Sequence, residues 1–218
     1  MTSPSVFTRN DLNILTVYKY RSFDNNIDHN GYKMLFQNEL FFPTFNLLND
    51  PFEGSIPVQD INELTDEQIV EANMFIQEYL NKDMNEETKT MLRKHFENDV
   101  SSIRAQKSGE EKRLLIEQQI KHLIESKLSV LSLTIDPLCY LMWSHYSNCH
   151  RGFCIGFNFK ELLKSLKTII PLFITYQDER PIYRYGDDDR EYAQKYLGTK
   201  GALWEYEQEV RLVSHKLK

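Results

Sequence analysis

The sequence predicts an α+β fold in which a helical segment is inserted between two flanks that are rich in strands. Glycine and proline punctuate both flanks, whereas the stretch from Val58 to Asp136 contains no proline and a single glycine. Residues 153–159 alternate large apolar side chains with smaller or polar ones, which is the period of two that a strand requires. A length of 218 residues with 41% hydrophobic residues is typical of one globular domain with such an insertion.

The first flank should contain strands, a short helix and a loop. Ile14 to Arg21 is rich in β-branched and aromatic residues and predicts the first strand. Tyr32 to Gln37 predicts a short helix, and Glu39 to Phe42 predicts a second strand, which ends at Pro43. The segment from Phe45 to Gly54 combines turn-forming residues with large aromatics, which indicates a loop held against the core.

The centre of the chain, residues 61–127, is expected to be the helical insertion. Thr65 is a suitable N-cap for a helix over 65–80, in which apolar residues recur at helical spacing. Two further helices are expected over 85–100 and 108–124, the last with one apolar stripe. The charged residues of these helices should form solvated faces.

The second flank returns to strand patterns that short helices separate. Strands are expected at 128–135, 153–159, 169–176 and 207–213, and helices at 138–146, 160–167 and 189–197. Asn158 is a suitable cap for the helix that follows it, and Pro171 favours an edge position for its strand. Flanks 10–60 and 128–218 should therefore fold together as one α+β domain, residues 1–218, which the insertion interrupts.

Charge and composition argue against several classes of protein. Lys and Arg number 26 against 32 Asp and Glu, and the net charge of -6 gives no global attraction to nucleic acid. No apolar run approaches the ~18 residues that a membrane span needs, and the first ten residues lack the pattern of a signal peptide. Three cysteines cannot all pair within one chain, so we expect a reducing, cytoplasmic location and no membrane association.

Familiar catalytic motifs are absent from the sequence, which has no phosphate-binding loop, no GxSxG elbow, no HExxH and no CxxC. Dispersed polar clusters must therefore carry the function. The first cluster is Tyr18 to Arg21, at the end of the first predicted strand, where Lys19 and Arg21 share one face. An arginine among aromatics suits a bidentate grip on phosphate or carboxylate, although a surface arginine at a strand end would have the same sequence.

Two more clusters offer polar side chains that also have structural explanations. In the segment Asn49 to Glu53, Asp50 or Glu53 could bind a metal or act as a base, but an Asx-turn explains the same residues. The segment around His145, Tyr146 and His150 lies among the cysteines, whose spacing matches no standard zinc site. Substrate contacts from these three residues are the alternative to a role in packing.

The fourth cluster lies close to the C-terminus. Glu207, Glu209 and Arg211 would project from one face if they lay on one strand. Two neighbouring carboxylates repel one another and favour at least one raised pKa, unless a cation such as Arg211 compensates. We expect this cluster to carry a functional role.

Together the clusters resemble a family of uncharacterised bacterial proteins, a domain-of-unknown-function group. The shared pattern consists of four motifs in order, YKYR from Tyr18, NDPFE from Asn49, WSHY with HRG-C-GF from Trp143, and WxYExExR from Trp204. This resemblance covers the chain apart from its helical centre, and it brings no known activity.

A more distant resemblance is to ADP-ribosyltransferase-like domains, which have a mostly antiparallel, split β-sheet. Such domains hold NAD with a His or Arg on the first strand, followed by a Ser/Thr-bearing strand, an aromatic, and a late Glu that often lies within Gln/Glu-x-Glu. Here Arg21, Ser132, Tyr146 and the segment from Glu207 to Glu209 occupy those places.

The resemblance implies that NAD is the substrate of a transferase or NAD glycohydrolase, in a toxin or phage-defence context. It implies that Glu209 is the catalytic carboxylate, which stabilises an oxocarbenium-like state, and that Glu207 is its helper on the acceptor side. The residues that it implies for NAD binding are Arg21, Tyr20, Ser132, Tyr146 and His145. The acceptor, a protein, a nucleic acid or a small molecule, is not implied, and neither is the oligomeric state.

Two other functions stay open from the sequence. One is a metal-dependent nuclease or other hydrolase, with Arg21 and Arg151 on phosphate and a set of hard-cation ligands. Those ligands would be Asp50, Glu53, His145, Glu207 and Glu209. The other is a non-catalytic interaction module, with the helical centre as the surface for a partner.

Overall fold

The computed structural model describes residues 15–50, 57–60, 63–81, 83–105, 113–114, 117–118, 121–122, 126–166, 169–182, 184 and 195–215. The chain divides into two compact units. The first is Met1–Gly54 with Leu123–Arg180 and Ala193–Lys218, and the second is Ser55–His122 with Pro181–Tyr192. None of the helices within these described ranges is long and apolar enough to cross a membrane.

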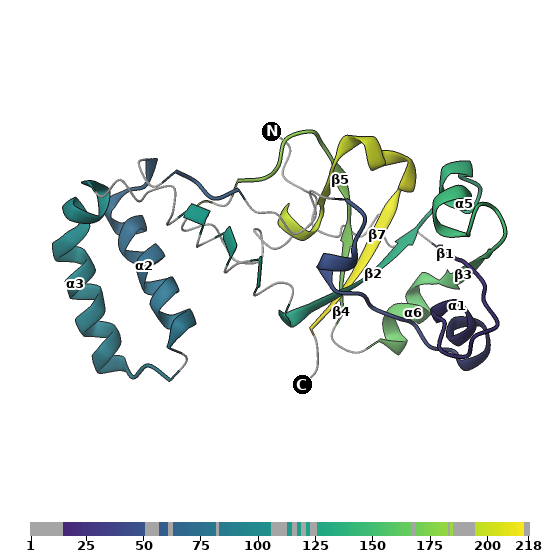
Figure 1. The fold of residues 1–218 in the computed structure, drawn as a ribbon, viewed down its shortest axis with the longest axis horizontal. Coiled ribbons are helices and arrows are strands. Elements are labelled where there is room, and N and C mark those ends of the chain that lie inside the picture. Colours follow the sequence, from purple (N-terminus) through teal and green to yellow (C-terminus); the bar gives the residue numbers. More distant parts are fainter. Residues whose placement is uncertain are drawn as a thin grey trace. The chain divides into compact units, whose positions relative to one another are not determined.

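A five-stranded sheet, in which every pairing is antiparallel, forms the first unit (Figure 1). Its order is β3-β1-β2-β7-β4, with the bounds β1 Thr16–Arg21, β2 Leu128–Thr134, β3 Phe153–Asn158, β4 Ile169–Phe173 and β7 Glu209–His215. Two short strands, β5 (Thr175–Tyr176) and β6 (Thr199–Lys200), form a separate parallel pair. The expected α+β class is confirmed, and so is the mostly antiparallel sheet.

Alternation along the central strands separates an apolar face of this sheet from a polar one. Leu131 and Leu133 of β2 and Val210 and Leu212 of β7 belong to one buried core cluster. Their neighbours in sequence must point to the opposite face, where Ser132 pairs with Arg211 and Thr134 with Glu209. This face is therefore polar at the end of β2 and β7 that holds Ser132, Thr134, Glu209 and Arg211, and apolar further along, where Val130 pairs with Val213.

Short helices cap and cover the sheet. Helix α6 (Phe159–Ser165) begins at Asn158, whose side chain accepts a hydrogen bond from the backbone N–H of Glu161, as predicted. Phe159 and Leu162 of α6 pack into the core cluster. Helix α5 (Tyr140–Tyr146) confirms the helix expected before β3, and α1 (Asn30–Tyr32) continues as a π-helix over Lys33–Gln37.

Two expectations for strands are wrong. Residues 39–42 form no strand, because their Leu40 and Phe42 pack against the core cluster while the backbone stays outside the sheet ladder. Glu207 belongs to a 3-10 helix, Ala202–Glu207, and not to the last strand, because Gln208 adopts a left-handed φ of 41° and ends the helix before β7 begins. The expected edge position of the strand with Pro171 is confirmed, since β4 lies at the edge of the sheet.

The second unit contains α2 (Asp66–Leu80) and α3 (Glu86–Ala105), which confirm two of the helices expected in the centre. Thr65 and Gln68 form a capping box at the start of α2. The two helices run antiparallel, because ion pairs join Arg104 at the end of α3 to Asp66 at the start of α2, and Arg93 to Glu71 nearer their middle. Much of the third expected helix and of the helix at 189–197 lies outside the described residues.

Candidate functional site

A cavity of about 170 Å³ lies where β1 and β2 separate. The ladder between these two described strands contains one pair, Tyr18 with Thr134, while the other edge of β1 pairs with β3 and the other edge of β2 pairs with β7. Other residues of the two strands do not pair with one another and line the cavity between them. The loop before Asp50, helix α5, β6, the 3-10 helix and β7 supply the other walls.

The structure brings together six of the seven residues that the sequence assigned to the site. The residues that line this one cavity are Tyr20, Arg21, Ser132, Tyr146, Glu207 and Glu209. His145 is exposed and does not line it, and its Nδ1 atom lies 3.0 Å from the hydroxyl of Tyr206. His150 is also exposed, on a turn where three successive residues adopt left-handed backbone conformations. Residues 51–53 of the NDPFE motif lie outside the described residues.

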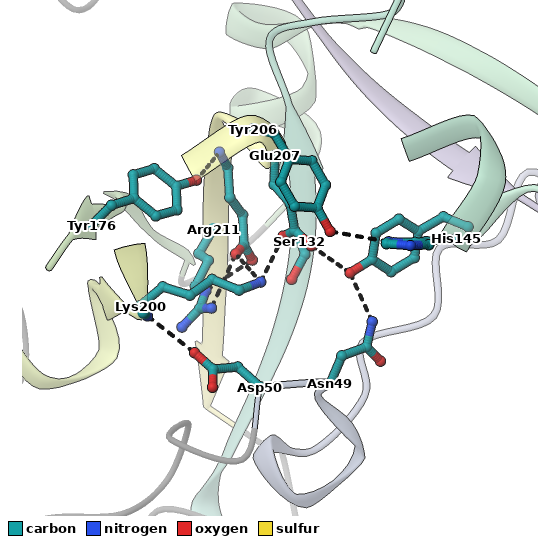
Figure 2. Close-up of polar contacts among 12 residues, drawn as sticks. Asn49, Asp50, Ser132, His145, Tyr176, Lys200, Tyr206, Glu207 and Arg211 are labelled. Carbon is teal, nitrogen blue, oxygen red and sulfur yellow. Dashed lines mark hydrogen bonds and ion pairs between the residues drawn. The ribbon is translucent and has the colours of Figure 1, made fainter. Parts of the chain in front are cut away.

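Glu209 is the centre of a buried ion network with Arg211 and Lys200, which are both labelled in Figure 2. Arg211, which is 1% exposed, donates from Nε and Nη2 to the two oxygens of Glu209 at 2.9 and 3.0 Å. Lys200 donates to Oε2 of the same carboxylate at 3.1 Å, and Ser132 adds a side-chain hydrogen bond. Burial alone would raise the pKa of Glu209, but Arg211 and Lys200 more than offset burial and hold this pKa well below its usual range.

Glu207 is held in a different way, although it is also buried. Its Oε2 accepts a hydrogen bond from Lys200 at 2.6 Å, and its Oε1 accepts one from the Tyr146 hydroxyl at 2.5 Å. Asn49 donates to the same hydroxyl at 2.7 Å, so Tyr146 is fixed from both sides. Burial and the nearby charge of Glu207 raise the pKa of Tyr146 well above its usual value, which keeps its hydroxyl protonated.

The number of hydrogen bonds that each carboxylate accepts distinguishes Glu209 from Glu207. A carboxylate offers about four acceptor positions. The Glu209 carboxylate receives two hydrogen bonds from Arg211, one from Lys200 and one from Ser132, and is therefore saturated. Among the described residues, Glu207 receives hydrogen bonds only from Lys200 and Tyr146, which leaves acceptor positions for a ligand in the cavity.

Backbone contacts hold the network in place. Asp50, which is 2% exposed, accepts a hydrogen bond from the backbone N–H of Gly201, next to Lys200 (Figure 2). The Tyr176 hydroxyl accepts one from the backbone N–H of Glu209 at 2.7 Å. The first residues of the NDPFE motif therefore contribute to the site, Asn49 through Tyr146 and Asp50 through Gly201.

The β1 wall of the cavity is cationic. Lys19 and Arg21 are both partly buried, and Lys19 donates to the backbone carbonyl of Ser132 at 2.6 Å. Burial and the charge of Arg21 lower the pKa of Lys19 to about 7. Burial also lowers the pKa of Arg21.

Sequence reasoning missed Lys200, which bridges the two carboxylates, and Tyr176, which holds the backbone of Glu209. Neither residue shows a periodic pattern, because each lies in a strand of two residues. A signal for Lys200 did exist: Glu207 and Glu209 with one nearby arginine leave an unbalanced negative charge that a buried site must neutralise. The sequence left open whether a raised pKa or compensation by Arg211 would relieve the repulsion between the carboxylates, and the structure shows that Arg211 pairs with Glu209.

The proposed metal ligands do not come together in the part of the chain that the structure describes. There, no group of three His, Cys, Asp or Glu side chains could hold a metal ion. Lys200 and Arg211 already neutralise Glu207 and Glu209, and His145 contacts Tyr206. Glu53, the remaining expected ligand, lies outside the described residues.

Comparison with models of known protein families gives a match over residues 142–212. No curated protein and no solved structure matches the chain significantly. The matching part of the chain runs from α5 to β7 and includes Tyr146, Lys200, Glu207 and Glu209, but neither β1 nor β2. The resemblance to an uncharacterised domain family is confirmed here, because residues 142–212 match the family described as Protein of unknown function (DUF2971).

Proposed function

We propose that the protein cleaves the bond between nicotinamide and ribose in NAD, as an ADP-ribosyltransferase-like transferase or an NAD glycohydrolase. The observation that carries the proposal is the composition of one cavity. Its β1 wall presents the cations Lys19 and Arg21, and the same cavity is lined by Glu207, which has open acceptor positions. NAD has a matching polarity, with a diphosphate at its centre and ribose hydroxyls beside the bond that breaks.

The size of the cavity fits part of this substrate. At about 170 Å³ it is larger than the space that one water needs but too small to enclose a whole dinucleotide. We infer that it receives the ribose at the reacting end, and that the remainder of NAD extends through its opening. Tyr18 and Tyr146 line the cavity and are partly exposed, so their rings are candidates for stacking with nicotinamide, whereas Tyr20 is buried against Trp143.

The reaction needs negative charge close to the ribose. When the glycosidic carbon–nitrogen bond breaks, its electron pair goes to the ring nitrogen, and the pyridinium leaves as neutral nicotinamide. The ribose acquires oxocarbenium character, which a fixed carboxylate stabilises electrostatically. An acceptor oxygen, or that of water, then bonds to the same carbon and gives up a proton.

Hydrogen bonding favours Glu207 for the contact with ribose. Because Glu209 is saturated by Arg211, Lys200 and Ser132, it would have to lose an existing partner before it could hold a ribose hydroxyl. Glu207 needs no such exchange. We therefore assign the ribose contact to Glu207, and to Glu209 the orientation of Lys200 beside it, which reverses the roles that the sequence resemblance implied.

The other residues have supporting roles in this proposal. Ser132 helps to orient Glu209, and Tyr146 orients Glu207 through its hydroxyl. His145 and Tyr206 lie outside the cavity lining, where they suit contacts with an acceptor better than contacts with NAD. A sheet whose β1 and β2 pair at a single position supports the likeness to the split sheet of ADP-ribosyltransferase-like domains.

The experiment is to incubate the purified full chain with NAD labelled in its adenine and to separate the products. Release of nicotinamide with free labelled ADP-ribose would identify a glycohydrolase, and transfer of the label to an added protein or nucleic acid would identify a transferase. If folded protein left NAD intact with water and with each acceptor class, the proposal would be wrong.

A further inference from the structure

The two cations of the β1 wall differ from the others near the cavity in how they are paired. Arg211 and Lys200 form ion pairs with Glu209 and Glu207. In the part of the chain that the structure describes, no hydrogen bond or ion pair engages the guanidinium of Arg21. The ammonium of Lys19 donates one hydrogen bond, to the carbonyl oxygen of Ser132, which carries no charge.

Leaving two like charges side by side in a partly buried wall is unfavourable without a ligand. Lys19 and Arg21 are two residues apart on β1, and each lines the cavity. A phosphate or diphosphate group supplies both negative charge and several acceptor oxygens. The planar guanidinium can bind two such oxygens at once, while the ammonium binds as a point charge.

We propose that Lys19 and Arg21 form an anion subsite for phosphoryl oxygens, and that Lys19 takes up a proton when the anion binds. The inference rests on the proposed function for the identity of the natural ligand, the diphosphate of NAD. The chemistry of the subsite itself requires only a phosphate ester or a similar oxyanion.

The surroundings of Lys19 explain the proton uptake. In the free protein, burial and the charge of Arg21 lower the pKa of Lys19 to about 7, and Lys200 of β6 acts in the same direction. Glu209 of β7 and Glu207 of the 3-10 helix act in the opposite direction. A bound anion adds negative charge next to Lys19 and so raises its pKa, which means that the bound state holds a proton that the free state has partly lost.

Affinity for the anion should therefore depend on pH. Near pH 6, Lys19 is already charged in the free protein, whereas near pH 8 most molecules must first bind a proton. For a free pKa of about 7, linkage makes binding about tenfold weaker at pH 8 than at pH 6.

The test uses ADP-ribose and sulfate as probes, because both keep a constant charge over this pH range. Their affinities for the full chain are measured by calorimetry at constant ionic strength near pH 6, 7 and 8. The wild-type protein should bind both probes about tenfold more weakly at the highest of these pH values, and it should take up protons near neutral pH.

Two substitutions of Lys19 distinguish the effect of its positive charge on binding from the effect of its change in protonation. Lys19→Arg keeps a permanent charge, so binding should persist and lose its pH dependence. Lys19→Met should weaken binding near pH 6 by about 10- to 100-fold, as expected for a lost charge-assisted hydrogen bond, and leave little pH dependence. Lys164→Met is the matched control, because Lys164 is exposed and pairs with Glu161 outside the cavity.

Arg21→Gln provides an independent check on the coupling. It should weaken binding of both probes at every pH. Because the charge of Arg21 lowers the pKa of Lys19, its removal should also move the midpoint of the pH dependence to higher pH. Circular dichroism on each variant shows whether the fold persists.

The outcomes distinguish this inference from the proposed function. If NAD stays intact but both probes bind with the expected pH dependence, the anion subsite stands and the NAD reaction does not. If wild-type affinity is the same at pH 6 and pH 8, or if folded Lys19→Met binds as wild type does, the subsite is wrong even where nicotinamide is released.

Discussion

Arg211 grips Glu209 with two hydrogen bonds, of 2.9 and 3.0 Å, in a part of the sheet from which water is almost excluded. The same guanidinium donates from Nη1 to the backbone carbonyl of Leu197 at 2.8 Å. This pair neutralises one carboxylate of the cavity and leaves Lys200 to bridge to Glu207. The two buried acidic residues therefore differ in their hydrogen bonding, since Glu209 is fully engaged and Glu207 keeps acceptor positions open.

Glu209→Gln should lower stability strongly, because it leaves the buried Arg211 without a counter-charge. Removing one partner of a buried ion pair costs about 3–5 kcal/mol, which would appear as a lower free energy of unfolding in urea. Glu161→Gln is the control, since Glu161 forms an exposed pair with Lys164 and its substitution should change stability much less. Equal stabilities of the two variants would refute the structural role of Glu209.

Tyr146→Phe should slow NAD cleavage while the fold persists. The substitution removes the hydroxyl that donates to Glu207 and accepts from Asn49. Hydrogen bonds to a charged group contribute about 1.5–3 kcal/mol, so nicotinamide release should fall by about 10- to 100-fold. Tyr206→Phe, which removes a hydroxyl outside the cavity lining, should change the rate much less. An unchanged rate for Tyr146→Phe would show that Glu207 needs no such orientation.

Gly152→Ala should displace the end of β1. A Cβ atom at this position would lie 2.1 Å from the carbonyl oxygen of Arg21, and a backbone atom cannot move away cheaply. We expect a loss of about 1–3 kcal/mol or more in unfolding free energy and weaker binding of ADP-ribose. Gly201→Ala is the matched control, because its Cβ would meet its nearest neighbour, Asp50, at 3.5 Å. Similar stabilities for the two alanine variants would contradict the close approach.

Lys19→Met should stabilise the free protein more in mild acid than in mild alkali. The pKa of Lys19 is about 7 in the folded chain and higher in the unfolded chain, so the unfolded chain binds more protons above neutrality. The charged form of buried Lys19 destabilises the folded wild type. This destabilisation decreases as the pH rises above about 7, and the variant has no such pH dependence. Urea unfolding near pH 6 and near pH 9 measures the difference. A gain of the same size at both pH values would show that Lys19 does not titrate in this range.

Local patterns were sufficient for most elements of the fold. Period-two alternation predicted β3, a composition rich in strand-forming residues predicted β2, and Asn158 and Thr65 cap the helices that they were expected to start. The segment from Glu39 to Phe42 had the composition of a strand, but pairing depends on which edges the sheet leaves open. A sequence does not show those edges.

The site was predictable where its residues stood in motifs. Arg21, Tyr146 and Glu209 line one cavity although they are far apart in the chain. Lys200 could not be found in this way, because its importance comes from the carboxylates that surround it in space. The difference in hydrogen bonding between Glu207 and Glu209 also depends on Gln208. Its left-handed backbone conformation places Glu207 outside the strand.

The most direct measurement is the rate of nicotinamide release from NAD by wild-type protein and by Glu207→Gln. This variant keeps the Lys200–Glu209 pair, so it should remain folded, which its urea unfolding curve verifies. We predict release by the wild type and a rate at least about 100-fold lower in the variant, as expected when a preorganised electrostatic contact to the transition state is lost. No release by folded wild-type protein, or the same rate in Glu207→Gln, would contradict the account.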